Sequence, residues 1–232
     1  MKIKFTNVEK VSDAYLPKPS SDFIPSWYKD TKSYYPHGIK EVNDGKPNFT
    51  IKKCMPVFDA LTAGYIITTY TDVWVTHGPK EGTIFNWSSF KPIQFHPNFQ
   101  ADKHPLSKEV NGESFPKWIN AWGIETPKGY SCLFINPMHN PNGIFTILEG
   151  IVDTDQYTAA VSFPFVMNDI HFEGLIPAGT PIAQVIPFKR ESWKMEFGNE
   201  KDIEKQQKLS EKMISRFFDK YKTFAWIKKE YK

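Results

Sequence analysis

From Phe49 onward the sequence is a series of short apolar runs that turn residues separate at close intervals. β-Branched and aromatic residues dominate these runs, Gly, Pro, Asn and Asp bound them, and no helical periodicity lies between them. The runs read FTIKKCMPV, YIITTYTDVWV, GTIFNW, KPIQFH, YSCLFINP, GIFTILEGIV, YTAAVSFPFV and PIAQVIPF. Many short strands without intervening helices are typical of antiparallel sandwiches or barrels. We therefore predict a mainly β core domain over residues 49–198.

The two flanking segments have a different texture. Residues 1–48 contain five prolines and little periodicity, which predicts an extended arm packed on the core. Its aromatic residues, Trp27, Tyr28, Tyr34 and Tyr35, are expected to anchor it. In residues 199–232 apolar side chains recur at a spacing of four, which predicts a carboxyl-terminal amphipathic helix. These side chains are Leu209, Met213, Phe217 and Tyr221, with Ile214 and Phe218 beside them.

Charge and apolar patterning exclude several kinds of partner. A net charge of +3, with lysines spread along the chain, predicts no nucleic-acid binding. No run of about 18 apolar residues and no signal peptide are found, so we expect no membrane contact and a cytoplasmic protein. The two cysteines, Cys54 and Cys132, are expected to be reduced, with Cys54 buried in a strand.

The histidines do not form a recognisable metal-binding pattern. His171 and Glu173 are spaced like the His-x-carboxylate pair of jelly-roll iron oxygenases, but no histidine follows them to complete the triad. Common zinc motifs are also absent from the sequence. We therefore predict no metal site in the protein itself and a structural role for His171.

Four stretches, in this order, resemble the dUTP pyrophosphatase and dCTP deaminase superfamily, whose members have an antiparallel β-clip fold. The stretches are LTAGYIITTYTD, ETPKGYSCLF, EGIVDTDQY and IPAGTPIAQVIPF. The corresponding family motifs run Ala-Gly-Tyr-Asp, Pro-Arg-Ser-Gly, Gly-x-Ile-Asp-x-x-Tyr and Gly-x-x-Ile-Ala-Gln. The resemblance covers roughly residues 62–190 and implies a nucleotide-binding domain, Mg²⁺ as cofactor if the protein is catalytic, and a homo-oligomer, trimeric in that family.

The resemblance also implies roles for individual residues. Asp153 corresponds to the aspartate that activates water, with Asp155 as the alternative. Tyr157 corresponds to the aromatic residue under the deoxyribose, although one extra residue separates it from Asp153. Gln184 falls where the family contacts phosphate, and Lys128 stands in the second motif as the one cation.

Three positions depart from the family pattern and remove substrate contacts. The aspartate of the first motif is Ile66, the Arg-Ser pair of the second is Lys128-Gly129, and Pro181 precedes Ile-Ala-Gln in the fourth. A triphosphate needs several cationic and hydrogen-bonding groups, so the loss bears directly on activity. The family's glycine-rich closing arm is replaced here by the predicted helix.

A second resemblance, over most of the chain, is to an uncharacterised protein family of bacteria and their phages. It rests on the stretches KCMPVFDALTAGY, TPKGYS and GTPIAQVIPFKRE, and it implies no activity. This leaves a second functional hypothesis open: a non-enzymatic structural or protein-interaction module, possibly phage-encoded. An exposed apolar patch would favour it, and the candidates are Phe115, Trp118, Trp122, Tyr130 and Trp193, for which core packing is the alternative.

The sequence leaves one further alternative open at GIVDTDQY. Asp153 and Asp155 either belong to a catalytic loop or only accept hydrogen bonds from backbone amides of a turn. The catalytic hypothesis requires Asp153, Tyr157, Lys128 and Gln184 to converge on one cavity, within a chain or across a symmetric interface.

Overall fold

The structure is a computed structural model, and it describes residues 1–34, 49–78, 82–100, 103–105, 114–214 and 221–232. The chain divides into two compact units. Unit one contains Met1–Ile24, Leu61–Arg190 and Tyr231–Lys232, and unit two contains Pro25–Ala60 and Glu191–Glu230. Each unit is described by itself.

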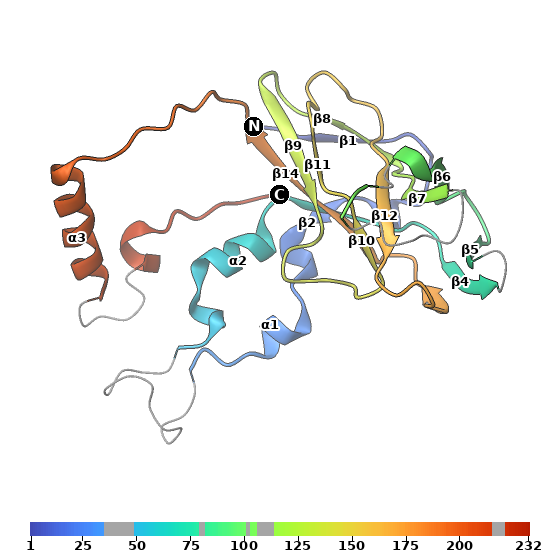
Figure 1. The fold of residues 1–232 in the computed structure, drawn as a ribbon, viewed down its shortest axis with the longest axis horizontal. Helices are drawn as coiled ribbons and strands as arrows, with labels where there is room; N and C mark the ends of the chain where they lie inside the picture. The colour runs from blue at the N-terminus through green and yellow to red at the C-terminus, as the bar shows by residue number, and fades with distance from the viewer. Residues whose placement is uncertain (35–48, 79–81, 101–102, 106–113, 215–220) are drawn as a thin grey trace. The chain divides into compact units, whose positions relative to one another are not determined.

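Unit one consists of four antiparallel sheets (Figure 1). The first pairs β1 (Lys4–Asn7) with β8 (Trp122–Glu125). The second has the order β10 (Phe145–Ile147), β12 (Phe163–Met167), β7 (Ser114–Trp118) and β6 (Ile93–Pro97). The third has the order β11 (Gly150–Val152), β9 (Tyr130–Ile135), β14 (Pro181–Lys189), β3 (Tyr65–Thr68) and β2 (Lys18–Pro19). The fourth has the order β13 (Gly174–Ile176), β4 (Val73–Gly78) and β5 (Gly82–Trp87).

The predicted mainly β, antiparallel fold class is confirmed. Each of the four sheets is open, so the barrel alternative is not realised among the described strands. The amino-terminal arm contributes β1 and β2 as edge strands, together with the 3₁₀ turns η1 (Asp13–Tyr15) and η2 (Ser20–Phe23). A further 3₁₀ turn, η4 (Asn98–Gln100), follows β6.

Aromatic side chains fill the core of unit one. Trp118 stacks on Phe165 with ring centroids 4.9 Å apart, and Phe145 packs against both rings. Trp118 and Trp122 are fully buried, so these two candidates for a surface patch belong to the core. Burial of such rings is a major source of folding free energy, which accounts for the aromatic content of the β runs.

Unit two is largely helical. It contains α1 (Ser26–Asp30), the 3₁₀ turn η3 (Ile51–Lys53), most of α2 (Met55–Thr62), α3 (Glu200–Ile214) and the π-helical turn η5 (Tyr221–Ala225). The carboxyl-terminal segment is tied to α2, because the carboxylate of Asp59 accepts hydrogen bonds from Trp226 Nε1 at 3.0 Å and from Lys229 Nζ at 2.6 Å.

The strand expected at FTIKKCMPV is wrong, because this stretch forms η3 and the start of α2. The Thr50 side chain accepts a hydrogen bond from Lys52 N and so caps the turn. Pro56 lies in the first turn of α2, where its missing N–H has no helical partner to lose. Cys54 is therefore exposed between two helical elements, and the prediction of a buried strand cysteine is also wrong.

The carboxyl-terminal segment contains an amphipathic helix, α3, which covers Glu200–Ile214 of the predicted 199–232, while Tyr221 lies in η5. A capping box starts α3: Asn199 Oδ1 accepts from Lys201 N at 3.0 Å, and Asp202 Oδ2 accepts from Asn199 N at 3.0 Å. Leu209 and Met213 lie on α3, while Phe217 and Phe218 lie outside the described residues.

The predicted arm anchors have separate outcomes. Tyr28 is buried within unit two and its hydroxyl donates to Lys52 O, while Trp27 stays 40% exposed. Tyr35 lies outside the described residues. Across the described ranges, no helix combines the length and the apolar character needed to cross a bilayer.

Candidate functional site

Strand register brings the predicted site residues to one end of the third sheet. Ile151 lies opposite Leu133, and Leu133 lies opposite Ile186. Directly opposite residues in an antiparallel sheet project to the same face, and so do residues two apart on one strand. The next row on this face therefore contains Asp153, Ser131 and Phe188, and Ser131 is paired with Phe188. Asp155 and Arg190 follow beyond the ends of β11 and β14.

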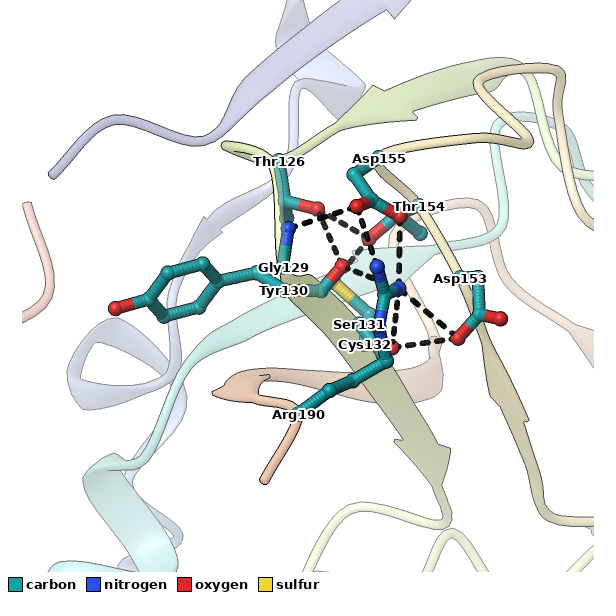
Figure 2. Close-up of polar contacts among 9 residues, drawn as sticks. All are labelled: Thr126, Gly129, Tyr130, Ser131, Cys132, Asp153, Thr154, Asp155 and Arg190. Atoms are coloured by element: carbon teal, nitrogen blue, oxygen red, sulfur yellow. Dashed lines mark hydrogen bonds and ion pairs between the residues drawn. The ribbon is translucent and has the colours of Figure 1, made fainter. Parts of the chain in front are cut away.

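Arg190 is the centre of the polar cluster (Figure 2). Its guanidinium binds Asp155 in a bidentate manner, with Nη1 donating to Oδ1 at 2.7 Å and Nη2 donating to Oδ2. Nη1 also contacts Ser131 Oγ at 3.1 Å, Tyr130 O at 3.2 Å and Asp153 Oδ1 at 3.1 Å. The guanidinium is thus occupied by groups of the protein itself.

The Asp155 side chain is only 2% exposed, and both of its oxygens are paired. Oδ2 also accepts a hydrogen bond from Gly129 N at 2.8 Å. The hydrogen bonds from Arg190 and then from Gly129 hold the pKa of the Asp155 carboxyl well below its usual range. The same pair raises the pKa of Arg190. A buried carboxylate is stable only when paired in this way, so Asp155 is a structural ion-pair partner within one chain.

Gly129 connects three segments at this point. Its N–H donates to Asp155 and its carbonyl accepts from Arg190 N at 2.8 Å. Its φ is +85°, a left-handed conformation that glycine adopts without a Cβ penalty. The neighbouring Lys128 is exposed, so its ammonium is presented from a loop whose backbone is fixed.

Asp153 differs from Asp155 in exposure and in its contacts. Its side chain is 60% exposed, and Oδ1 accepts from Ser131 Oγ at 2.7 Å as well as contacting Arg190. Oδ2 accepts no hydrogen bond from the described residues, and Figure 2 shows it directed away from the cluster. The carboxylate is therefore oriented through one oxygen and presents the other to solvent.

The turn itself is held by backbone bonds. Asp153 O accepts from Gln156 N at 2.9 Å and from Tyr157 N at 2.8 Å. The buried Thr154 hydroxyl bonds Thr126 Oγ1 at 2.7 Å and contacts Cys132 Sγ at 3.3 Å. Neither aspartate side chain accepts a described backbone N–H of its own turn: Asp155 accepts from Gly129 N and Arg190, and Asp153 accepts from the Ser131 hydroxyl and contacts Arg190.

The predicted site residues are thus brought together only in part. Lys128, Asp153 and Asp155 lie around Gly129 and Arg190, and Tyr157 lies at the end of the turn that Asp153 begins, with a 53% exposed side chain. Gln184 is 1% exposed, with Oε1 accepting from Met138 N at 2.8 Å and Nε2 donating to Ala63 O at 2.7 Å. Gln184 and Arg190 are six positions apart along β14 and its end, about 20 Å of extended strand. The ligand-binding roles of these residues stay predictions.

Sequence reasoning missed Ser131 and Arg190 as members of the cluster. Their contacts with Asp153 depend on the pairing of β9 with both β11 and β14, which no local motif encodes. The sequence signal for Arg190 is an arginine directly after the strand-like stretch PIAQVIPFK.

A metal ion held by protein side chains alone does not fit this cluster. Both Asp155 oxygens and one Asp153 oxygen already pair with Arg190 or Ser131, and no group of three His, Cys, Asp or Glu side chains suited to a metal occurs in the described ranges. His171 packs against the ring of His77 with centroids 5.1 Å apart, and Glu173 Oε1 accepts from His77 N at 2.9 Å. These contacts agree with a structural role for His171.

Comparison with solved structures returns dUTPases of staphylococcal phages. One is a mutant dUTPase of Staphylococcus bacteriophage 80alpha with dUpNHpp, 11% identical, with a TM-score of 0.34 and coverage of 86% of this chain and 89% of that one. Another is a mutant dUTPase of phage phi11 of S. aureus, also 11% identical, with a TM-score of 0.35 and coverage of 86% and 98%; it is described as coordinating a structural Mg(II) ion. Because these TM-scores are below 0.5, we base neither the fold nor the function of this chain on them. No protein-family model and no curated protein matches the sequence.

Proposed function

We propose that the Asp153 cluster binds a small phosphorylated or nucleotide-like ligand. The supporting observation is the exposed Asp153 carboxylate, which Ser131 and Arg190 orient through Oδ1 while Oδ2 faces solvent. Lys128 supplies the cation for a phosphate and Tyr157 supplies an exposed ring for a sugar or base. In this proposal Asp155 does not touch the ligand; it holds the Arg190 guanidinium in place, and Arg190 in turn orients Asp153.

The cluster also has the elements of a hydrolytic step. Asp153 Oδ2 accepts a proton from a water molecule, whose oxygen then attacks a phosphorus atom of the ligand, and the phosphate leaving group departs. Mg²⁺ would enter with the phosphates, because it is commonly bound through substrate oxygens and few protein carboxylates. The Arg190 guanidinium is occupied by Asp155, so neutralisation of the phosphates depends on Lys128 and the metal ion.

Gln184 can contact a ligand in this proposal only if its side-chain amide gives up one of its hydrogen bonds to the backbone and forms one to the ligand instead. Its distance along β14 requires a second copy to bring it near Asp153, as in the trimer that the sequence resemblance implies. The site around Asp153 does not depend on this contact.

The proposal is tested with a panel of deoxynucleoside triphosphates and Mg²⁺. Release of phosphate or pyrophosphate and the shift in melting temperature are measured for the wild type and for Asp153→Asn. Glu125→Gln is the matched control, because it neutralises an exposed carboxylate that pairs with Lys4 on another sheet. Turnover or a thermal shift that Asp153→Asn abolishes and Glu125→Gln retains supports the proposal. The proposal would be refuted if every nucleotide gave no turnover and no thermal shift.

A non-enzymatic interaction module is the second candidate function. It is favoured by Trp193, which is 88% exposed, unlike Trp118 and Trp122. The phage setting of this candidate comes from the sequence resemblance. Binding of a protein partner that Trp193→Ser abolishes, in a protein without nucleotide response, would select this candidate over the first.

A further inference from the structure

The connection between β14 and α3 carries three large apolar side chains that the described residues leave exposed. Trp193, Met195 and Phe197 are 88%, 80% and 89% exposed. Residues 191–199 form no helix or strand and appear in Figure 1 as a long coil before α3. Side chains two apart lie on the same side of an extended chain, so this segment can present one apolar edge. We call Trp193, Met195 and Phe197 the apolar segment.

Large exposed side chains normally occur singly on a soluble protein. Here three occur within five residues, and Lys194 and Glu196 between them are also exposed. The alternation of apolar and charged residues is that of a strand with one face to bury. The segment therefore has the sequence pattern of a strand with one buried face, but its apolar side chains are exposed to solvent.

A surface that can accept this segment lies on the third sheet. Ile151, Leu133 and Ile186 are directly opposite one another across β11, β9 and β14 and form an aliphatic row, which Phe188 extends. Ile151 is 63% exposed and the other three are partly exposed. Among the described strands β11 pairs only with β9, so its outer edge is open. We call Ile151, Leu133 and Ile186 the aliphatic row.

We propose that the apolar segment of one copy of this chain packs on the aliphatic row of a second copy. Each copy carries both the apolar segment and the aliphatic row, so a closed assembly covers both surfaces on every copy. The smallest closed assembly is a dimer in which each copy places its segment on the row of the other. A ring of more copies can be built from the same segment-to-row contact.

The area of this contact matches what a stable association needs. An aromatic side chain buries about 150–250 Å². Trp193, Phe197 and Met195 together then bury roughly 500 Å² of their own surface, and the row and its surroundings lose a similar area. Two reciprocal contacts therefore bury about 2,000 Å², within the range of specific protein–protein interfaces.

The test uses light scattering of the full chain over a range of concentrations, with two variants. The segment variant, Trp193→Ser/Met195→Ser/Phe197→Ser, replaces the three apolar side chains of the segment. The row variant, Ile151→Lys, places a charge in the aliphatic row. All four positions are exposed, so both variants are expected to fold, which circular dichroism verifies. The wild type should have a multiple of the mass of one chain, and each variant alone should be monomeric. Phe99→Ser, which removes an exposed ring elsewhere, is the control and should associate like the wild type.

A mixture of the two variants decides whether the two surfaces bind each other. The segment variant retains the row and the row variant retains the segment, so an equimolar mixture should restore one contact and form a mixed complex. A monomeric wild type at about 100 µM, far above the Kd of a standard interface, would overturn the proposal. Association that neither variant weakens, or a mixture that stays monomeric while the wild type associates, would also overturn it. Because no ligand is present, the result is independent of the ligand proposed for Asp153.

Discussion

Arg190 binds Asp155 through two hydrogen bonds and contacts Asp153 with the same guanidinium. The Asp155 side chain is 2% exposed and the Asp153 side chain is 60% exposed. Two aspartates that are two positions apart thus have different physical roles. Asp155 fixes the arginine, and the arginine together with Ser131 orients the carboxylate that meets solvent.

Asp155→Asn should destabilise the protein, because it removes the negative charge that pairs with Arg190 at a side chain that is only 2% exposed. We expect a fall in melting temperature on the order of 5 °C or more for a chain of this size. Differential scanning calorimetry measures it, with Glu125→Gln as the control. A melting temperature equal to that of the control would mean that the ion pair does not contribute to folding.

The pH dependence of stability should report the same ion pair. The folded-state pKa of Asp155 lies below its ordinary value of 3.8, so the unfolded chain binds more protons in the interval between the two values. The contribution is complete above about pH 4 and is lost as pH falls through the folded pKa. The difference in melting temperature between wild type and Asp155→Asn should therefore be constant from about pH 6 to 8 and shrink below about pH 4. A difference that grows on acidification would contradict this assignment.

Local patterns in the sequence predicted the strands and the residue types of the site, but not its assembly. The short runs of β-branched and aromatic residues predicted the antiparallel sheets, because each run is a half-buried strand bounded by turn residues. FTIKKCMPV was misread because its β-branched residues also fit a strand, whereas Thr50 caps the 3₁₀ turn η3 and Pro56 lies in the first turn of α2. The contacts of Ser131 and Arg190 depend on the register of three strands, which is a property of the whole sheet.

Gln184→Leu tests whether Gln184 is structural or binds ligand. Its amide pairs with Met138 N and Ala63 O, and the substitution leaves the part-buried Met138 N–H unpaired, while Ala63 O keeps the hydrogen bond from Ser20 Oγ. The expected cost is about 1–2 kcal/mol of unfolding free energy, measured by urea denaturation at unchanged m-value. Gln94→Leu, at an exposed position of β6, is the control and should change stability by less than about 0.5 kcal/mol. A stable Gln184→Leu variant with a lost ligand response would instead support the phosphate-contact prediction.

Gly129→Ala isolates the cost of the loop conformation. No atom lies within 4 Å of an added Cβ, so the substitution meets no steric obstacle and strains only the backbone at a φ of +85°. We expect a loss of about 1 kcal/mol in the free energy of unfolding. Gly150→Ala is the control, because its added Cβ also meets nothing and its φ is not positive. Equal stabilities of the two variants would show that the left-handed conformation is not maintained in solution.

Asp153→Asn separates a ligand-binding carboxylate from a turn-capping one. A capping aspartate costs about 1 kcal/mol on substitution. Asp153 caps no described amide of its turn, and asparagine retains an oxygen for the Ser131 hydroxyl, so we expect a change below about 0.5 kcal/mol. In the presence of the nucleotide that shifts the wild-type melting temperature, the variant should show no shift. Thermal melts of both proteins, with and without nucleotide and Mg²⁺, measure the two effects separately. A destabilised variant with a normal ligand response would assign Asp153 to the turn alone.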